Sequence, residues 1–275
     1  STHRRSSAAS DVYKRQVVTT YRDHGHMIAR GLDPKRIMAE LTGREDGYSA
    51  GKGGSMHMFS KENNFYGGHG IVGAQVPIGT GIAFTHKYNG EKNICRTYIG
   101  DGAMNNGQVF EAFNLAALWK LPVLYIIENN KYGMGTSVDR AAAGLDLYKR
   151  GEAFGIPGEK VDGMNVFSVI EAADKAGKYV REGNGPYIIE VQTYRYRGHS
   201  MSDPAKYRTK EELDNYKQTD PIEIVKAEIL KKKIATNDEI EKINKDTLEE
   251  IKNAAEFATN SPFPKDSELY TDVYL

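Results

Sequence analysis

Short apolar runs alternate with longer segments through the middle of the chain. Runs that are almost entirely apolar are typical of strands with both faces buried, as in a parallel sheet. The longer segments between them predict crossover helices. The predicted strands are residues 94–99, 123–127 and 187–194, and the predicted helices are residues 34–41, 76–88, 108–119 and 166–181. This alternation predicts an α/β fold with a mostly parallel sheet.

Capping residues, glycines and charges define the remaining segments. Asp33 and Pro34 are typical of a helix N-terminus, as cap and first-turn residue. Residues 51–73 contain seven glycines and predict a loop region that is ordered only if something packs on it. From Lys210 to about residue 259 the pattern is charged and helical, and residues 262–275 predict a partly extended tail.

The first 16 residues look foreign to the fold. Residues 1–10 contain no acidic residue and no apolar period, so residues 1–16 are expected to be a transit-type leader or a cloning-derived segment. The absence of an initiator methionine favours an N-terminally incomplete chain. Residues 17–275 are predicted to form one domain, with a helical C-terminal region from about residue 210.

Composition excludes several classes of protein. The chain has 37 basic and 37 acidic residues and a formal net charge of zero, which does not suggest binding to nucleic acid or to a membrane surface. No apolar run is long enough for a membrane span. The single cysteine, Cys95, lies in an apolar run and predicts a buried structural thiol in a soluble protein of a reducing compartment.

Polar residues stand at the ends of two successive predicted strands. The first strand runs into Gly100-Asp101-Gly102, and the next runs into Asn129-Asn130. The 26 residues between Gly102 and Asn129 are about the length of one helical crossover. A βαβ unit of this kind brings Asp101 and Asn130 together at the carboxyl edge of a parallel sheet, where open α/β sheets bind ligands.

The chemistry of this pair favours a metal and a diphosphate. Carboxylate and amide oxygens are hard ligands that suit Mg²⁺, which completes its octahedron with phosphate oxygens and water. Gly100 and Gly102 allow the backbone to approach a phosphate closely, and a helix starting near Gly107 directs its positive end to the same edge. The alternative is a plain strand–turn–helix in which Gly-Asp-Gly is only turn chemistry.

Three segments carry a resemblance to a known family: residues 100–112 (Gly-Asp-Gly-Ala-Met-Asn-Asn-Gly-Gln-Val-Phe-Glu-Ala), 128–137 (Glu-Asn-Asn-Lys-Tyr-Gly-Met-Gly-Thr-Ser) and 194–204 (Tyr-Arg-Tyr-Arg-Gly-His-Ser-Met-Ser-Asp-Pro). In this order and spacing they resemble alpha subunits of the thiamine-diphosphate-dependent pyruvate dehydrogenase component. The resemblance covers roughly residues 17–260. It implies a three-layer α/β/α thiamine-diphosphate-binding fold.

The resemblance also implies a set of site residues. Asp101, Asn130 and the main-chain carbonyl of Tyr132 are expected to bind Mg²⁺, and His199 is expected to line the active site as the catalytic residue. Tyr21, Arg22 and Arg195 are expected to hold the diphosphate, and the backbones of Gly70 and Val72 to contact the aminopyrimidine ring. The full expected cofactor-binding set is Tyr21, Arg22, Gly70, Val72, Gly100, Asp101, Gly102, Ala103, Asn130, Tyr132, Arg195 and His199.

The activity that the resemblance implies is oxidative decarboxylation of pyruvate. The acetyl group would pass to the lipoyl group of a dihydrolipoyl acetyltransferase core, linking glycolysis to acetyl-CoA. A separate beta subunit would complete an alpha2-beta2 enzyme and supply the glutamate that activates the aminopyrimidine. The alternatives are the alpha subunits for branched-chain 2-oxo acids or acetoin, and a truncated non-catalytic subunit. A shortened loop at residues 203–209 favours a bacterial cytoplasm over a mitochondrial matrix.

Overall fold

The computed structural model describes residues 15–273, which divide into two compact units. The first unit contains residues 15–18 and 71–235, and the second contains residues 19–70 and 236–273. Each unit is described by itself below. The expectation of one domain over residues 17–275 stays a prediction.

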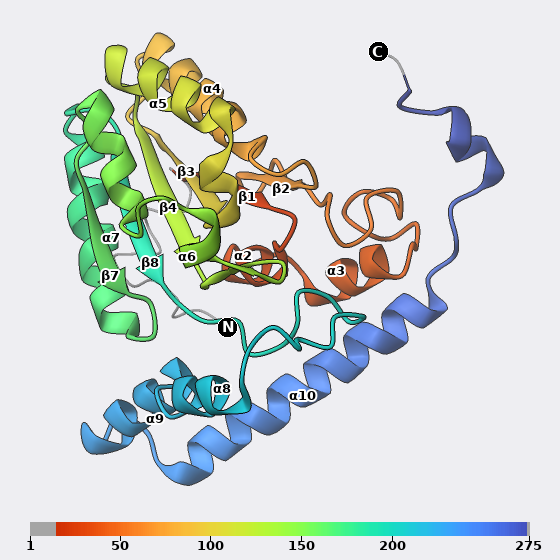
Figure 1. Ribbon diagram of the computed structural model, residues 1–275. Coiled ribbons are helices and arrows are strands. Elements are labelled where there is room, and N and C mark those ends of the chain that lie inside the picture. The colour runs from red at the N-terminus through yellow and green to blue at the C-terminus, as the bar shows by residue number, and fades with distance from the viewer. Residues whose placement is uncertain (1–14, 274–275) are drawn as a thin grey trace. The chain divides into compact units, whose positions relative to one another are not determined.

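A parallel sheet forms the centre of the first unit (Figure 1). Its strands lie in the order β1-β3-β4-β8-β7, and each neighbouring pair is parallel. Strand β1 runs across the boundary into the second unit, where β2 is its neighbour in the strand order. The strands are β1 (Arg15–Thr20), β2 (Phe65–His69), β3 (Ile94–Gly100), β4 (Val123–Asn129), β7 (Gly158–Asp162) and β8 (Tyr187–Gln192).

Helices cover both faces of this sheet. Helix α7 (Val166–Arg181) packs on one face, and α4 (Gln75–Tyr88) and α5 (Gly107–Leu118) lie on the other (Figure 1). The first unit therefore has the predicted α/β/α layers. Its other elements are η2 (Gly102–Asn105), β5 (Tyr132–Gly133), β6 (Thr136–Ser137), α6 (Val138–Ala141), η3 (Leu147–Phe154), α8 (Lys210–Lys217) and α9 (Pro221–Lys231).

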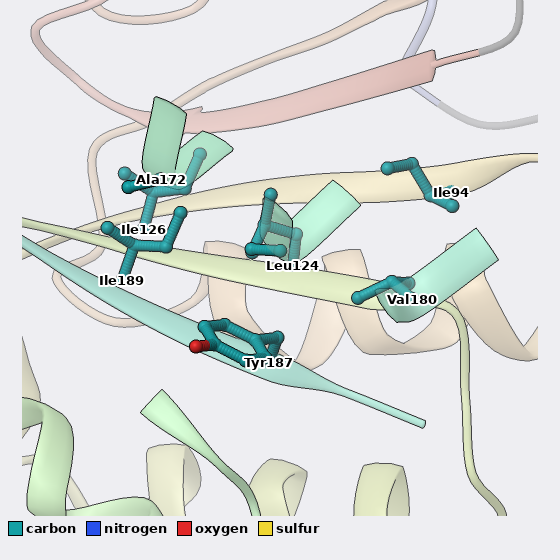
Figure 2. Packing of buried hydrophobic residues seen from close by; sticks show 8 residues of the cluster. Ile94, Leu124, Ile126, Ala172, Val180, Tyr187 and Ile189 are labelled. Atoms are coloured by element: carbon teal, nitrogen blue, oxygen red, sulfur yellow. The ribbon is translucent and has the colours of Figure 1, made fainter. Parts of the chain in front are cut away.

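Alternation along the strands divides the core between the two faces. Figure 2 shows the α7 side, where Leu124 and Ile126 of β4 and Ile189 of β8 pack with Ala172 of the helix. On the opposite side, the Tyr125 hydroxyl lies 2.7 Å from the Thr80 hydroxyl of α4. The Tyr125 ring also packs against Phe113 of α5, with ring centroids 4.7 Å apart. Both faces of β4 are thus buried, which explains its apolar run.

The second unit is built around two packed helices, α3 (Pro34–Leu41) and α10 (Asn237–Asn260). The predicted cap is confirmed, because the Asp33 carboxylate accepts a 2.9 Å hydrogen bond from the Lys35 N–H. Thr236 and Glu239 form a reciprocal capping box at the start of α10. The remaining elements of this unit are α2 (His24–Ala29), β2 (Phe65–His69) and η4 (Asp266–Tyr270).

Several elements depart from the expectations. The loop predicted for residues 51–73 contains β2, whose Phe65 is fully buried, so that expectation was wrong for residues 65–69. Residues 1–14 of the expected leader lie outside the described residues, whereas Arg15 and Gln16 belong to β1.

Two smaller expectations have clear outcomes. Cys95 is fully buried, and burial raises its pKa to about 12, which confirms the structural thiol. Among the helices of residues 15–273, none is both long and apolar enough to span a membrane.

Candidate active site at the carboxyl edge of the sheet

The ends of β3 and β4 meet at one edge of the sheet. Gly100 pairs with Glu128 in parallel register, so the residues that follow each strand leave the sheet side by side. A Cβ atom on Gly133 would lie 3.5 Å from the Gly102 Cα and 4.0 Å from the Asp101 Oδ2. The turn after β3 and the turn after β4 therefore pack backbone against backbone. Ala103, at the start of η2, is buried beneath this edge.

Asp101 is a buried carboxyl group in this arrangement. Its residue is 5% exposed, and burial raises its pKa above the ordinary value. Hydrogen bonding from its own backbone and from the backbone of Asn130 opposes that rise, as do the charges of Arg195 and Lys131. The structure thus brings Asp101 and Asn130 within contact, as the strand order predicts. A buried carboxylate of this kind gains most when a cation binds beside it.

The two asparagines at the end of β4 have different roles. The buried Asn129 donates a 2.8 Å hydrogen bond to the Glu190 carboxylate of β8 and accepts one from the Lys131 N–H at 3.2 Å. Asn130 is half-buried, and its Oδ1 accepts only a 3.3 Å hydrogen bond from the Tyr132 N–H among those identified. Asn129 therefore ties the strand to the sheet, whereas the Asn130 amide oxygen holds the turn that leads to Tyr132.

Arg195 fastens the β5–β6 hairpin next to these residues. Its guanidinium donates hydrogen bonds to the Tyr132 carbonyl at 3.1 Å, the Met134 carbonyl at 2.7 Å and the Tyr207 hydroxyl at 2.7 Å. A carbonyl oxygen has two lone pairs, so the Tyr132 carbonyl retains one for a metal ion. The diphosphate contact expected of Arg195 stays a prediction.

The His199 loop is attached to Arg195 through two intermediates. Asp203 accepts hydrogen bonds from the His199 N–H at 2.6 Å, the Ala205 N–H at 2.8 Å and the Tyr207 hydroxyl at 2.8 Å. These donors lower the pKa of Asp203 to about 2. Tyr207 then joins Asp203 to Arg195, so the backbone at His199 is fixed relative to the hairpin that carries Tyr132.

A carboxylate on α8 holds the other end of Tyr132. Glu212 accepts the Tyr132 hydroxyl at 2.9 and 3.0 Å and the Tyr194 hydroxyl at 3.0 Å. Burial, followed by the neighbouring Glu212, raises the pKa of Tyr132 to about 12. The roles of Asp203, Tyr207 and Glu212 were not predicted from the sequence. Two local signals were available: Asp-Pro, which favours turns, and Thr209 three residues before Glu212, a helix N-cap pattern.

Tyr132→Phe is expected to leave Mg²⁺ binding within about twofold of the parent, because the expected ligand is the main-chain carbonyl and the hydroxyl is occupied by Glu212. Loss of that hydrogen bond to a charged acceptor is expected to cost about 1–2 kcal/mol of stability. Titrating Mg²⁺ at saturating thiamine diphosphate measures the affinity, and thermal unfolding measures the stability. A large loss of Mg²⁺ affinity would count against the carbonyl as ligand.

Val72 is held by the first turn of α5. Its carbonyl accepts hydrogen bonds from the Asn106 side chain at 3.1 Å and the Gln108 side chain at 3.2 Å. Gly73 has φ +88°, and a Cβ there would lie 2.6 Å from the Gln108 Nε2. Glycine is therefore required at this turn.

The other expected cofactor residues lie in the second unit. Tyr21 and Arg22 follow β1, with the Arg22 guanidinium carbon 5.9 Å from the centre of the Tyr21 ring. Gly70 follows β2, and a Cβ there would lie 3.0 Å from the His57 Nε2. The cofactor contacts expected of these three residues stay predictions.

The residues at the carboxyl edge fit a hard cation. Across residues 15–273 there is no group of three or more His, Cys, Asp and Glu side chains that could hold a metal ion. Asp101, Asn130 and the Tyr132 carbonyl instead offer three oxygens of different kinds. Such a set suits Mg²⁺ with its remaining positions filled by phosphate and water.

Comparison with known proteins identifies the family. The family model described as "Dehydrogenase E1 component" matches residues 5–267. A protein of Rickettsia felis named "Pyruvate dehydrogenase E1 component subunit alpha" is 59% identical over 257 residues, covering 94% of this chain and 79% of the relative. A protein of Rhizobium meliloti with the same name is 59% identical over 261 residues, with 94% and 75% covered. The mitochondrial counterpart of Dictyostelium discoideum is 56% identical over 261 residues, with 94% and 68% covered. The chain therefore belongs to the dehydrogenase E1 component family.

Proposed function

We propose that the chain is the alpha subunit of a pyruvate dehydrogenase that oxidatively decarboxylates pyruvate with thiamine diphosphate. The observation that carries the proposal is the meeting of Asp101 and Asn130 after two parallel strands, beside a clamped Tyr132 carbonyl. The names of the relatives above support pyruvate as the substrate. The acetyl group is then transferred to the lipoyl group of a dihydrolipoyl acetyltransferase.

Each part of the candidate site has a distinct task. Asp101, Asn130 and the Tyr132 carbonyl would hold Mg²⁺, and Mg²⁺ would anchor the diphosphate. Tyr21 and Arg22 would bind the diphosphate directly, and Arg195 would keep the Tyr132 carbonyl in place. Thiamine diphosphate held by these residues would supply a nucleophilic carbon for the keto group and a sink for the electrons released by decarboxylation.

His199 is the expected proton-handling and orienting residue near the reacting carbon. An imidazole can both give and take a proton, which suits such a task. Asp203 accepts a hydrogen bond from the His199 N–H and so fixes the backbone that carries the imidazole ring. Asp203 is thereby a positioning residue for the imidazole.

The chain is expected to be inactive without a beta subunit, because the glutamate that activates the aminopyrimidine is expected from that partner. We expect pyruvate-dependent reduction of an artificial electron acceptor only when the chain is mixed with the beta subunit and Mg²⁺-thiamine diphosphate. Equal rates for the chain alone and for the mixture would disprove the requirement for a glutamate from the beta subunit.

The same assay tests the substrate. Pyruvate, 2-oxoisovalerate and acetoin are compared in parallel, with and without the cofactor. A preference for pyruvate supports the proposal. A preference for 2-oxoisovalerate or acetoin would instead identify the chain as the alpha subunit of the enzyme for that substrate. Cofactor binding without turnover on any substrate indicates a folded but incomplete subunit.

The bacterial cytoplasm is the proposed location. The Rickettsia and Rhizobium relatives carry names without an organelle, whereas the Dictyostelium relative is named as mitochondrial. The short loop at residues 203–209 also favours the bacterial type. The proposed assembly is an alpha2-beta2 enzyme bound to a dihydrolipoyl acetyltransferase core.

A further inference from the structure

A fully buried carboxylate on α3 binds four backbone amides of the loop that follows. Glu40 is 0% exposed. Its Oε2 accepts the N–H groups of Ser49 at 2.8 Å and Gly51 at 2.9 Å. Its Oε1 accepts those of Gly53 at 2.7 Å and Gly54 at 3.0 Å. Burying a charge is costly unless it is hydrogen-bonded, and four charge-assisted bonds meet that requirement here.

The loop over residues 47–54 is folded closely around this carboxylate. A Cβ on Gly47 would lie 2.2 Å from the Glu40 Oε2 and 2.7 Å from the Glu40 Cα. Gly51 adopts a left-handed φ of +76° to turn its N–H inward. The glycines of this segment therefore serve the approach of backbone to a carboxylate inside the protein.

The loop in turn fixes the backbone of His57. The Ser49 hydroxyl donates a 2.7 Å hydrogen bond to the His57 carbonyl. Gly53 packs on the same carbonyl, since a Cβ there would lie 1.9 Å from its oxygen. Two residues of the Glu40-bound loop thus converge on one atom of His57.

His57 and its neighbour support the segment from Gly68 to Gly70. The His57 Nε2 and Cε1 lie 3.0 and 3.1 Å from where a Cβ on Gly70 would be. The Met56 carbonyl oxygen lies 2.6 Å from the equivalent position on Gly68. Contacts therefore run without a break from the Glu40 carboxylate to the backbone expected to meet the aminopyrimidine ring.

We propose that Glu40 is a positioning residue that, through residues 47–54, holds His57 against Gly70 and so sets the affinity for thiamine diphosphate. This inference rests on the proposed function. The role assigned to Glu40 is indirect: it orders the loop, the loop fixes His57, and His57 supports Gly70. A small displacement of such a support is sufficient to weaken a ligand contact strongly.

The test compares Glu40→Gln with Glu45→Gln, the same change at an exposed glutamate nearby. Glutamine has nearly the same volume, but its amide group opposes two of the four N–H donors. In the assembled alpha–beta enzyme, calorimetric titration with thiamine diphosphate at fixed Mg²⁺ is expected to show a Kd about tenfold higher for Glu40→Gln. Glu45→Gln is expected to leave it unchanged. Amide hydrogen exchange is expected to accelerate at Ser49, Gly51, Gly53 and Gly54.

A double-mutant cycle separates positioning from general damage. If Glu40 acts through His57, Glu40→Gln adds less than about twofold to the Kd of a His57→Ala enzyme. Ser49→Ala removes one hydrogen bond to the His57 carbonyl and keeps the loop amide on Glu40. It is expected to raise the Kd by about threefold, and it carries the test if Glu40→Gln does not fold.

The outcomes distinguish this inference from the function on which it rests. If Glu40→Gln raises the Kd for thiamine diphosphate about tenfold in both the parent and the His57→Ala enzyme, the inference is overturned. An unchanged Kd for Glu40→Gln in the parent overturns it as well. A parent enzyme that does not bind thiamine diphosphate overturns the proposed function and the inference together. The inference is supported if Glu40→Gln raises the Kd about tenfold in the parent and less than about twofold in the His57→Ala enzyme.

Discussion

Asp101→Asn is expected to raise the Mg²⁺ concentration for half-maximal activity at least about a hundredfold. Substituting a residue that only orients a metal ligand typically lowers metal affinity by about 10- to 100-fold. The substitution keeps the size of the side chain and removes its negative charge. A neutral amide oxygen compensates a divalent cation much less well than a carboxylate does. Activity at saturating pyruvate, titrated with Mg²⁺ at fixed thiamine diphosphate, measures the loss.

Thermal unfolding provides a second measurement that does not depend on turnover. Because burial disfavours the charged form of Asp101, the neutral isostere is expected to leave the cofactor-free protein at least as stable as the parent. The rise in melting temperature caused by Mg²⁺-thiamine diphosphate is expected to disappear. Asp139→Asn, an exposed aspartate on α6, is the control and should keep the rise. An Asp101→Asn enzyme that keeps it would exclude Asp101 as the ligand.

Local signals in the sequence predicted the centre of the fold well. The apolar runs of β3, β4 and β8 follow from burial on both faces of the sheet. Helix α7 has the predicted bounds, and in the structure Asn165 caps its first turn. Strand β7 was missed because it pairs only with β8 at one edge and consists of Gly-Glu-Lys-Val-Asp, without an apolar run. Strand β2 was missed because glycine density indicates a loop, whereas its glycines allow close packing of Phe59 and Asp23.

The candidate site was predictable only where topology determines it. Crossover length and strand order were sufficient to bring Asp101 to Asn130. The bonds of Arg195 to Tyr132 and of Glu40 to Gly54 join residues 63 and 14 positions apart, and neither follows from a periodic pattern. Such contacts depend on tertiary packing, so nothing in the sequence distinguished Glu40 from the other residues of the predicted helix over residues 34–41.

Asp23→Asn is expected to stabilise the protein at pH 8 and to have little effect at pH 4. Asp23 is 0% exposed, and burial raises its pKa from 3.8 to about 7, although the charge of His26 opposes the rise. A Cβ on Gly68 would lie 2.2 Å from its Oδ2 and 2.6 Å from the Met56 carbonyl oxygen, so another acceptor lies close to the carboxyl group. In a described ion pair, the His24 Nε2 lies 3.8 Å from the Asp23 Oδ1.

The direction of the pH effect follows from the raised pKa. The folded state holds the proton more tightly than the unfolded state, so the stability from this group is complete below pH 4 and is lost as the pH rises to about 7. A rise in pKa from 3.8 to about 7 corresponds to at most about 4 kcal/mol at pH 8, which asparagine recovers because it carries no charge. Thermal unfolding of the assembled enzyme from pH 5 to 8 measures the difference, with Asp174→Asn on the exposed side of α7 as control. A constant difference between Asp23→Asn and the parent across this range would mean that Asp23 is already ionised at pH 5. In that case hydrogen-bond donors or a cation would have to stabilise the charged carboxylate of Asp23, and burial would not determine whether it is protonated.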